Sequence, residues 1–249
     1  MDLSHKLKGL DPQVCPSPWE GYEHSKGYAV MILPFSSGHL LGLRVFPEND
    51  FAPYTSVWHR SPGGDWSIYN DGPSLQTTCP RWWGAALKNA AITRIKVDWV
   101  GKNTLKVEME KPNLEWIITM EAPVWLRLLN KLSMTMPLSS WRPGPRLRMR
   151  EWMAKRVLDM GDLELSFDTP SNQRAIIMPE RTYFIKQSEA ILEEVDLGQP
   201  VRLEENPRIG KVPLPIRGAF IVGQAHATIK DPIEYQQTKR LVRGHAKYR

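Results

Sequence analysis

The sequence predicts a mainly β protein, an antiparallel barrel or two half-barrels, with two inserted helices near residues 123–160. The chain of 249 residues contains 21 Pro and 17 Gly, which divide it into short elements. Short apolar runs follow one another between turn signals, as strands do. In 104–110, Leu105, Val107 and Met109 alternate with charged residues, the pattern of a half-buried antiparallel strand.

Length and composition indicate a soluble globular chain. At about 150 residues per domain, the length fits one large β domain or two small ones. Hydrophobic residues at 41% and charged residues at 24% exclude a disordered chain, a collagen and an integral membrane bundle. We predict an N-terminal extension (1–26), a barrel-like body (27–230) and a basic C-terminal tail (231–249).

The order of elements follows from changes in hydrophobic period. The predicted strands of the first half are 27–35, 39–46, 55–60, 65–71, 92–100, 104–110 and 114–121. Apolar residues then recur at helical spacing from Trp125 to Met136, which predicts a helix at 123–134, and a second helix follows at 146–160. Strand patterns return at 162–168, 174–180, 182–188, 190–198 and 217–229.

The hairpin around Ser61-Pro62-Gly63-Gly64 contains the first candidate catalytic residues. A symmetric turn pairs Arg60 with Trp66 and Val57 with Tyr69, so that one face carries Trp58, Arg60, Trp66 and Ile68. The other face carries Val57, His59, Ser67, Tyr69 and Asp71. His59 titrates near neutrality and can move a proton if Tyr69 or Asp71 orients it. The alternative is that the Trp face points inward and His59 faces water.

Glu115 is the third candidate for acid–base chemistry. Both sides of its strand are largely apolar, and burial there would raise the carboxyl pKa toward a useful value. The alternative is a carboxylate at a strand end in water. His59, Tyr69 and Glu115 are therefore the predicted catalytic residues.

The predicted ligand contacts are mainly aromatic. Arg81 beside Trp82 can hold an anionic head group or a carbonyl, although packing of Trp82 and Trp83 under a loop is the alternative. Four further tryptophans are expected to shape a cavity: Trp58, Trp66, Trp99 and Trp116.

Three segments resemble a known family. They are VWHRSPGGDWSIYNDG, VDWVGKNTLKVEMEKPNLEWIITME and PSNQRAIIMPERTYFIKQSEA. Over roughly residues 27–230, their Trp-bearing strands and PxG hairpins resemble the tandem lipocalin-like proteins of the hydroxyneurosporene synthase (carotenoid hydratase) group. The resemblance implies an antiparallel calycin-like or lipocalin-like barrel with a cavity for a long apolar molecule. It also implies water addition, elimination or cyclisation as the reaction.

No cofactor or metal is implied by local motifs. The sequence lacks GxGxxG, GxxxxGK[ST], HExxH and GxSxG, and its cysteines, Cys15 and Cys79, have no metal-ligand spacing. The N-terminal MDLSHKLKGLDPQV has no apolar core of a signal peptide, and no run reaches 18 apolar residues. We expect a cytoplasmic, reducing location.

The charge pattern indicates partners. The net charge is +6, and basic residues gather at 142–156 and again in the tail at Lys239, Arg240, Arg243, Lys247 and Arg249. The aromatic residues lie in strands away from these groups, which argues against nucleic acid. Trp125, Leu128, Leu129 and Leu132 form an apolar stripe beside the first group, which suits peripheral attachment to an anionic membrane. The alternative is that both helices pack their stripes onto the barrel.

Together these features predict a cofactor-independent enzyme of the lyase or isomerase type. It would perform hydration, dehydration, isomerisation or cyclisation on a lipophilic small molecule held in a β-barrel cavity. A non-catalytic carrier or sensor of a lipophilic ligand is the alternative.

Overall fold

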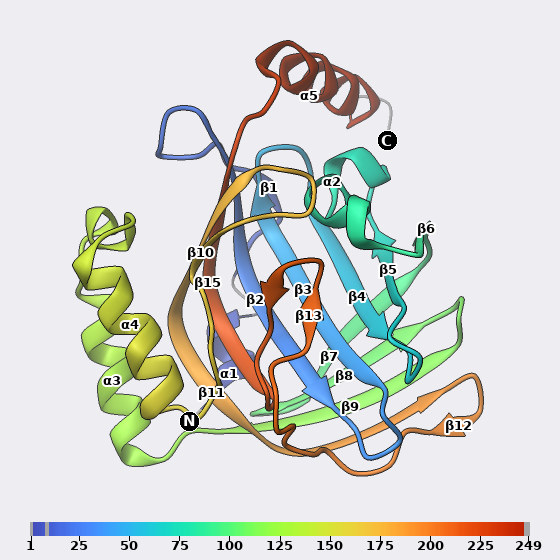
Figure 1. The fold of residues 1–249 in the computed structure, drawn as a ribbon. Coiled ribbons are helices and arrows are strands. Elements are labelled where there is room, and N and C mark those ends of the chain that lie inside the picture. Colours follow the sequence, from blue (N-terminus) through green and yellow to red (C-terminus); the bar gives the residue numbers. More distant parts are fainter. Residues whose placement is uncertain (1, 8–9, 247–249) are drawn as a thin grey trace.

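The computed structural model describes residues 2–7 and 10–246, with side chains up to residue 242, and is mainly β (Figure 1). The strands are Gln13–Val14 (β1), Tyr22–Pro34 (β2), Leu40–Asn49 (β3), Tyr54–Arg60 (β4), Trp66–Asp71 (β5), Asn89–Ile92 (β6), Ile95–Gly101 (β7), Thr104–Met109 (β8), Leu114–Glu121 (β9), Ser166–Asp168 (β10), Arg174–Leu192 (β11), Val195–Asp196 (β12), Arg208–Ile209 (β13), Val212–Pro213 (β14) and Ala219–Thr228 (β15). The helices are Leu3–Leu7 (α1), Pro80–Trp83 (α2), Val124–Met134 (α3), Pro145–Arg156 (α4) and Pro232–Ala246 (α5), with short 3-10 turns at Leu75–Thr77, Gly84–Ala86 and Leu138–Trp141.

One long sheet curls through the molecule in the order β6-β5-β4-β3-β2-β15-β11-β9-β8-β7. Its first and last strands, β6 and β7, are consecutive in the chain and are separated only by Thr93 and Arg94. The Thr93 amide donates to Asn70 O, and the Ile95 amide donates to Asp71 Oδ2. These bonds hold the β7 end of the sheet beside β5. The prediction of a mainly β chain is therefore confirmed, with a half-barrel sheet, whereas a calycin-type barrel stays a prediction.

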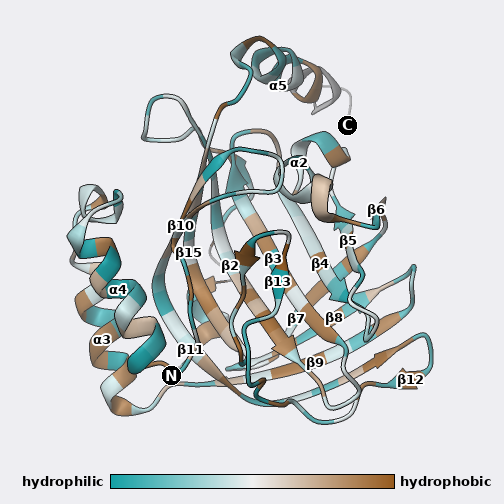
Figure 2. Cartoon of the chain, viewed as in Figure 1, coloured by the Kyte–Doolittle hydropathy of each residue, from teal (hydrophilic) through white to brown (hydrophobic). Residues whose placement is uncertain are grey.

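The inner face of the curl is filled by one hydrophobic cluster, which we call the interior cluster. Every second residue of the strands points inward, among them Leu43, Val57, Trp116 and Phe220. Figure 2 shows hydrophobic residues recurring along these strands. The helix α1 adds Leu3 and Leu7, both buried, to the same cluster. The segment predicted as an extension therefore forms part of the core.

The outer face of β2–β5 is buried under a second cluster. Phe46, Trp58, Trp66 and Ile68 point outward from the sheet and are all buried. They are covered by α2 and by the β13–β14 hairpin, which adds Val212 to the cluster. Both faces of these strands are thus covered, which explains their nearly continuous apolar runs.

The helices α3 and α4 lie side by side next to β11 (Figure 1). The two predicted helices are confirmed, although α4 ends at Arg156 rather than near residue 160. The tail includes a further helix, α5, which the sequence analysis did not predict. Lys247 and Arg249 lie outside the described residues. Across the described residues, no helix combines the length and the apolar character needed to cross a membrane.

Candidate functional site

The hairpin of β4 and β5 has the predicted register. Arg60 pairs with Trp66, His59 with Ser67 and Val57 with Tyr69. Neither face of this hairpin is freely solvated, because the tryptophan face is buried on the outer side and Val57 is buried on the inner side. His59 lies on the same side of β4 as Val57 and is half-buried. The face with Val57, His59 and Tyr69 therefore points into the curl, and the tryptophan face points outward under its cover.

His59 forms a pair with a second histidine, His39, from the turn before β3. Nδ1 of His39 and Nε2 of His59 are 2.8 Å apart, and the two rings stack with centroids at 5.1 Å. Burial, together with the His39 charge, lowers the pKa of His59 to about 4. At neutral pH one imidazole therefore donates a hydrogen bond to the other. Tyr69 packs against the interior cluster, and Asp71 accepts the Ile95 amide.

For Glu115 the structure favours the alternative of an exposed carboxylate over burial. The residue is exposed on β9, while its neighbours Leu114 and Trp116 are fully buried in the interior cluster. Because side chains alternate along a strand, only one side of β9 faces the inside of the curl, and this is the side with Trp116. The side that Glu115 shares with Ile117 faces outward. The structure therefore does not bring Glu115 to His59 and Tyr69, which belong to the inner side.

Three of the predicted ligand-contacting tryptophans serve packing. Trp99 packs against the interior cluster beside Tyr28, and Trp116 lies within that cluster. The indole N–H of Trp116 donates to Ser188 Oγ at 2.8 Å. Trp66 belongs to the outer cluster, where its indole donates to Arg208 O at 2.8 Å.

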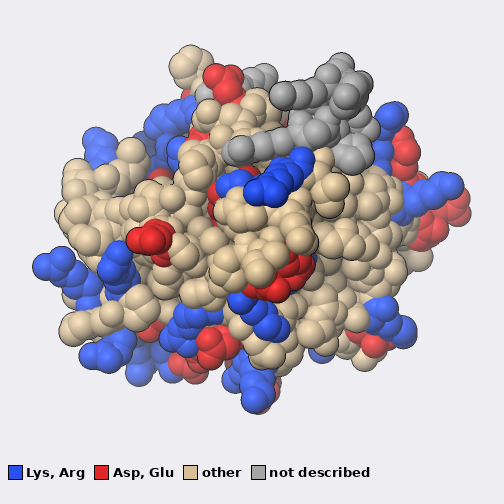
Figure 3. All heavy atoms as spheres, turned by 90° about the horizontal axis from the view of Figure 1, so that it is seen from above, with Lys and Arg blue, Asp and Glu red and all other residues tan. Residues whose placement is uncertain are grey.

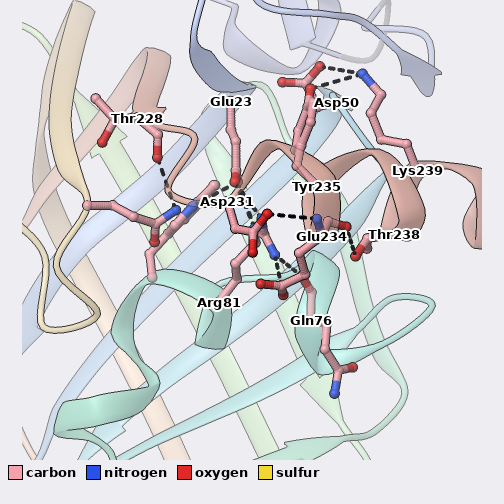
Figure 4. A network of polar contacts seen from close by, with 12 residues as sticks. Glu23, Asp50, Gln76, Arg81, Thr228, Asp231, Glu234, Tyr235, Thr238 and Lys239 are labelled. Atoms are coloured by element: carbon pink, nitrogen blue, oxygen red, sulfur yellow. Dashed lines mark hydrogen bonds and ion pairs between the residues drawn. The ribbon is translucent and has the colours of Figure 1, made fainter.

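Arg81 forms ion pairs with two carboxylates of the protein (Figure 4). Its guanidinium pairs with the buried Glu23 at 2.8 Å and with Glu234 of α5 at 3.6 Å. The indole of Trp82 donates to Glu23 Oε2 at 3.0 Å. Burial raises the pKa of Glu23, and the hydrogen bonds from Arg81 and Trp82 oppose that shift. Arg81 therefore ties α2 to β2 and to α5.

A cavity of about 90 Å³, which we call the first cavity, lies on the outer face of the sheet. Its floor includes the short side chains of Ala29, Ala225 and Ala227, and its cover includes Phe167 and Leu214. Of the predicted ligand contacts, Trp58 and Trp82 line it. The remaining lining is largely apolar and includes Met31, Phe46, Trp83, Leu163, Leu165, Ile177, Val212 and Ile221.

Arg44 on β3 is the cation of the first cavity. Its guanidinium donates to Val30 O at 2.5 Å, Leu43 O at 2.9 Å and Met31 O at 2.9 Å. These carbonyls lie where the β2–β3 register shifts, between Val30 and Leu33. The guanidinium carbon also lies 4.5 Å from the Trp58 ring centroid.

Among the described residues, the charge of Arg44 has no acidic partner. Within the described residues, Arg44 forms no ion pair, and Glu164, which borders the same cavity, has an exposed side chain. The neighbouring Tyr54 hydroxyl, near Cys79 Sγ at 3.6 Å, stays protonated because burial raises its pKa well above the usual value. Burial lowers the pKa of Arg44 to about 10, so the group is still charged at neutral pH.

A second cavity, of about 190 Å³, lies between α3, α4 and the sheet. Its lining is mostly Leu and Met. It shares Met31, Leu163, Leu165 and Ile221 with the first cavity, so the two are neighbours across these side chains. Leu132 and Met149 line it while being 56% and 52% exposed, which places its mouth on the outside of the two helices.

Sequence reasoning missed Arg44, which stands in the apolar run HLLGLRVF. The available signal was a lone charge on the side of the strand opposite Leu41 and Leu43. Among the described residues no three His, Cys, Asp or Glu side chains gather as a metal site requires. Comparisons with models of protein families, with curated proteins and with solved structures find no match. The resemblance to the carotenoid hydratase group therefore stays a prediction.

Proposed function

We propose that this protein binds a lipophilic molecule with an anionic head group, such as a fatty acid, in the first cavity. The observation that carries the proposal is the charged Arg44 in an apolar cavity, with no acidic partner in the part of the chain that the structure describes. A buried charge is costly unless it is paired, and protein carbonyls compensate it only in part. A carboxylate would supply the missing countercharge and bind by charge-assisted hydrogen bonds.

Arg44 retains donors for such a ligand. An arginine carries five N–H donors in a fixed fork, and three contacts to backbone carbonyls account for part of them. The indole of Trp58 is already directed to Ser56 Oγ at 3.2 Å, so its ring rather than its N–H faces the guanidinium. The ring would lie beside the head group and exclude water from it.

The residues shared by the two cavities offer a path for the apolar tail of the ligand. Met31 and Ile221 line both cavities, and an unbranched methionine side chain adapts readily to a neighbour. A chain anchored at Arg44 would pass these residues and occupy the second cavity. The first cavity alone is small for such a ligand, because ligand pockets commonly measure about 300–1,000 Å³.

Arg150, the arginine of the second cavity, is less suited to hold the head group because it is less deeply buried than Arg44, so water compensates more of its charge. Its guanidinium donates to Ser140 O at 2.9 Å and Ser140 Oγ at 3.0 Å. It also lies 3.6 Å from the Trp141 ring centroid. We therefore assign the head group to Arg44 and the tail to the second cavity.

The test compares a fluorescent polyene fatty acid with its methyl ester in titrations of the purified protein. The acid is expected to bind at least about tenfold tighter, because a hydrogen bond to a charged group contributes about 1.5–3 kcal/mol. The preference should disappear in Arg44→Met and be partly kept in Arg44→Lys. Mass spectrometry of molecules that copurify with the protein would identify the natural ligand class.

Arg150→Met is the matched control, because it removes the arginine of the second cavity and should keep the preference for the acid. Absence of saturable binding by both probes would overturn the proposal. Equal binding of acid and ester by the unaltered protein would reject Arg44 as the anchor.

The proposal corresponds to the carrier or sensor alternative of the sequence analysis. Acid–base catalysis by His59, Tyr69 and Glu115 stays a prediction. The carrier function is favoured because Arg44 lines the first cavity, whereas Glu115 faces outward on β9.

A further inference from the structure

We propose that the outer side of α3 and α4 docks on an anionic membrane surface and opens the second cavity to the bilayer. The docking surface consists of Val124, Trp125, Leu128 and Leu132 of α3 with Met149 and Trp152 of α4, all exposed. Loading of a ligand through this mouth rests on the proposed function, whereas the docking itself does not.

The exposed apolar residues of α3 form a stripe opposite its buried side. Leu126 and Asn130 face the sheet, and Leu128 and Leu132 recur one turn apart on the outward side. The predicted stripe of this helix therefore does not pack wholly onto the barrel. Clustered exposed Trp and Leu on one side of a soluble protein mark an interaction surface.

The charge around the docking surface indicates an anionic binding partner. Residues 124–156 contain eight Lys and Arg and one acidic residue, Glu151, while the rest of the chain has 25 basic and 26 acidic residues. The whole positive net charge therefore comes from this segment. On α3, Arg127 and Lys131 are exposed at the border of the apolar stripe, and Arg146 and Arg148 are exposed on α4. Figure 3 shows Lys and Arg side chains at this end of the molecule.

An apolar stripe bordered by cations is the arrangement of helices that lie in the interface of anionic bilayers. The mouth of the second cavity lies in the same surface, since Leu132 and Met149 belong to both. A docked protein would therefore present its cavity to the acyl region of the membrane.

Flotation with phosphatidylserine-containing vesicles tests the docking. We expect binding that weakens with salt and is lost with vesicles of phosphatidylcholine alone. The double change Arg146→Gln with Arg148→Gln should weaken partitioning roughly 30-fold, at about fivefold per charge near the surface. The double change Leu128→Ser with Leu132→Ser should weaken it at least about tenfold through lost apolar burial.

Matched controls separate this surface from general charge or hydrophobicity. Lys211→Gln with Lys230→Gln removes the same charge from exposed positions elsewhere. Ile191→Ser with Val195→Ser removes exposed apolar groups from the β11–β12 hairpin. Both control proteins should float as the unaltered protein does. Circular dichroism of each variant establishes that it is folded.

Recovery of the unaltered protein in the soluble fraction with and without anionic vesicles would overturn the docking proposal. A dimer in sedimentation that the leucine changes abolish, without flotation, would assign the surface to a second copy and also overturn it. The fatty-acid titration in vesicle-free buffer is independent of both outcomes. If that titration alone fails, docking stands and the ligand proposal falls.

Discussion

Asn130 of α3 and Thr182 of β11 exchange two hydrogen bonds, as two paired strands do. Asn130 Nδ2 donates to Thr182 O, and the Thr182 amide donates to Asn130 Oδ1, both at 2.9 Å. Thr182 lies two residues before the point where β9 begins to pair with β11 at Phe184. The side-chain amide therefore takes the place of a strand neighbour and fixes α3 to the sheet.

Asn130→Ala is expected to loosen α3. It leaves an amide and a carbonyl of Thr182 without partners in a buried place, at a cost of about 1–3 kcal/mol for each unsatisfied group. Hydrogen exchange should become faster in α3, while exchange in β3 and β4 stays as it was. Ser133→Ala, a half-buried position on the same helix, is the control. Unchanged exchange in α3 of Asn130→Ala would show that packing alone holds the helix.

Trp58 and Trp116 form a matched pair for locating the ligand. Both are fully buried, and each donates one indole hydrogen bond to a serine. Replacement of either by Phe should destabilise the fold by about 1–3 kcal/mol. Only Trp58→Phe should also lower the affinity for the fluorescent fatty acid, because Trp58 lines the first cavity and Trp116 lies in the interior cluster. Loss of affinity in Trp116→Phe alone would place the ligand inside the curl.

The contributions of Glu23 and Arg81 to the free energy of unfolding are expected to be coupled. Glu23 is 1% exposed, so Arg81→Met leaves a buried carboxylate without its cation. We expect a loss of about 3–5 kcal/mol in unfolding free energy, measured with denaturant. Glu23→Gln combined with Arg81→Met should lose much less than the two single changes added together.

The control for this cycle is Glu234→Gln, which removes the outer carboxylate around Arg81. Its side chain is largely exposed and lies 3.6 Å from Arg81, so no measurable destabilisation is expected. Additive losses in the Glu23–Arg81 cycle would contradict a coupled pair.

His226 should make the protein acid-sensitive. It is buried, its ring lies 4.9 Å from that of His24, and Nδ1 contacts Ser17 Oγ. Burial and the His24 charge lower its pKa from 6.5 to about 3. Between these values the unfolded chain binds a proton that the folded protein does not, so stability falls as the pH falls from about 6.5 toward 3.

Denaturation of His226→Phe at pH 6 and pH 4 measures this contribution. The phenyl ring keeps the contact with Trp19 and cannot be protonated. We expect the loss of stability between the two pH values to shrink by about 2–3 kcal/mol, at 1.36 kcal/mol for each pH unit. His5→Gln, at an exposed position, should leave the loss unchanged. An equal pH dependence in His226→Phe would exclude His226 as its source.

The local pattern predicted most of the sheet. The β4–β5 register followed from one turn of Pro and Gly, and 114–121 coincides with β9. Such features depend on neighbours in sequence, which alternation and turn chemistry report directly. The regular helix pattern likewise located α3 to within one residue at its start.

The candidate site could not be predicted in the same way. Its cover comes from residues 163–167 and 212–214, far in sequence from Arg44, and only the folded chain brings them together. Alternation also does not say which side of a strand faces the interior. The sequence therefore left undecided whether the Glu115 side or the Trp116 side of β9 is buried. The helix α5 was missed because tertiary contacts such as Tyr235 against Phe51 hold it.

The consecutive placement of β6 and β7 has a consequence for solubility. Exposed edge strands offer unpaired amides and carbonyls to other chains and so promote aggregation. Here the two terminal strands of one sheet are joined by Thr93 and Arg94, which keeps both edges close to each other. A flexible insertion between these two residues would preserve every strand pairing yet let the edges separate. We expect such a protein to fold, to keep any binding of the proposed fatty acid, and to aggregate edge to edge on standing.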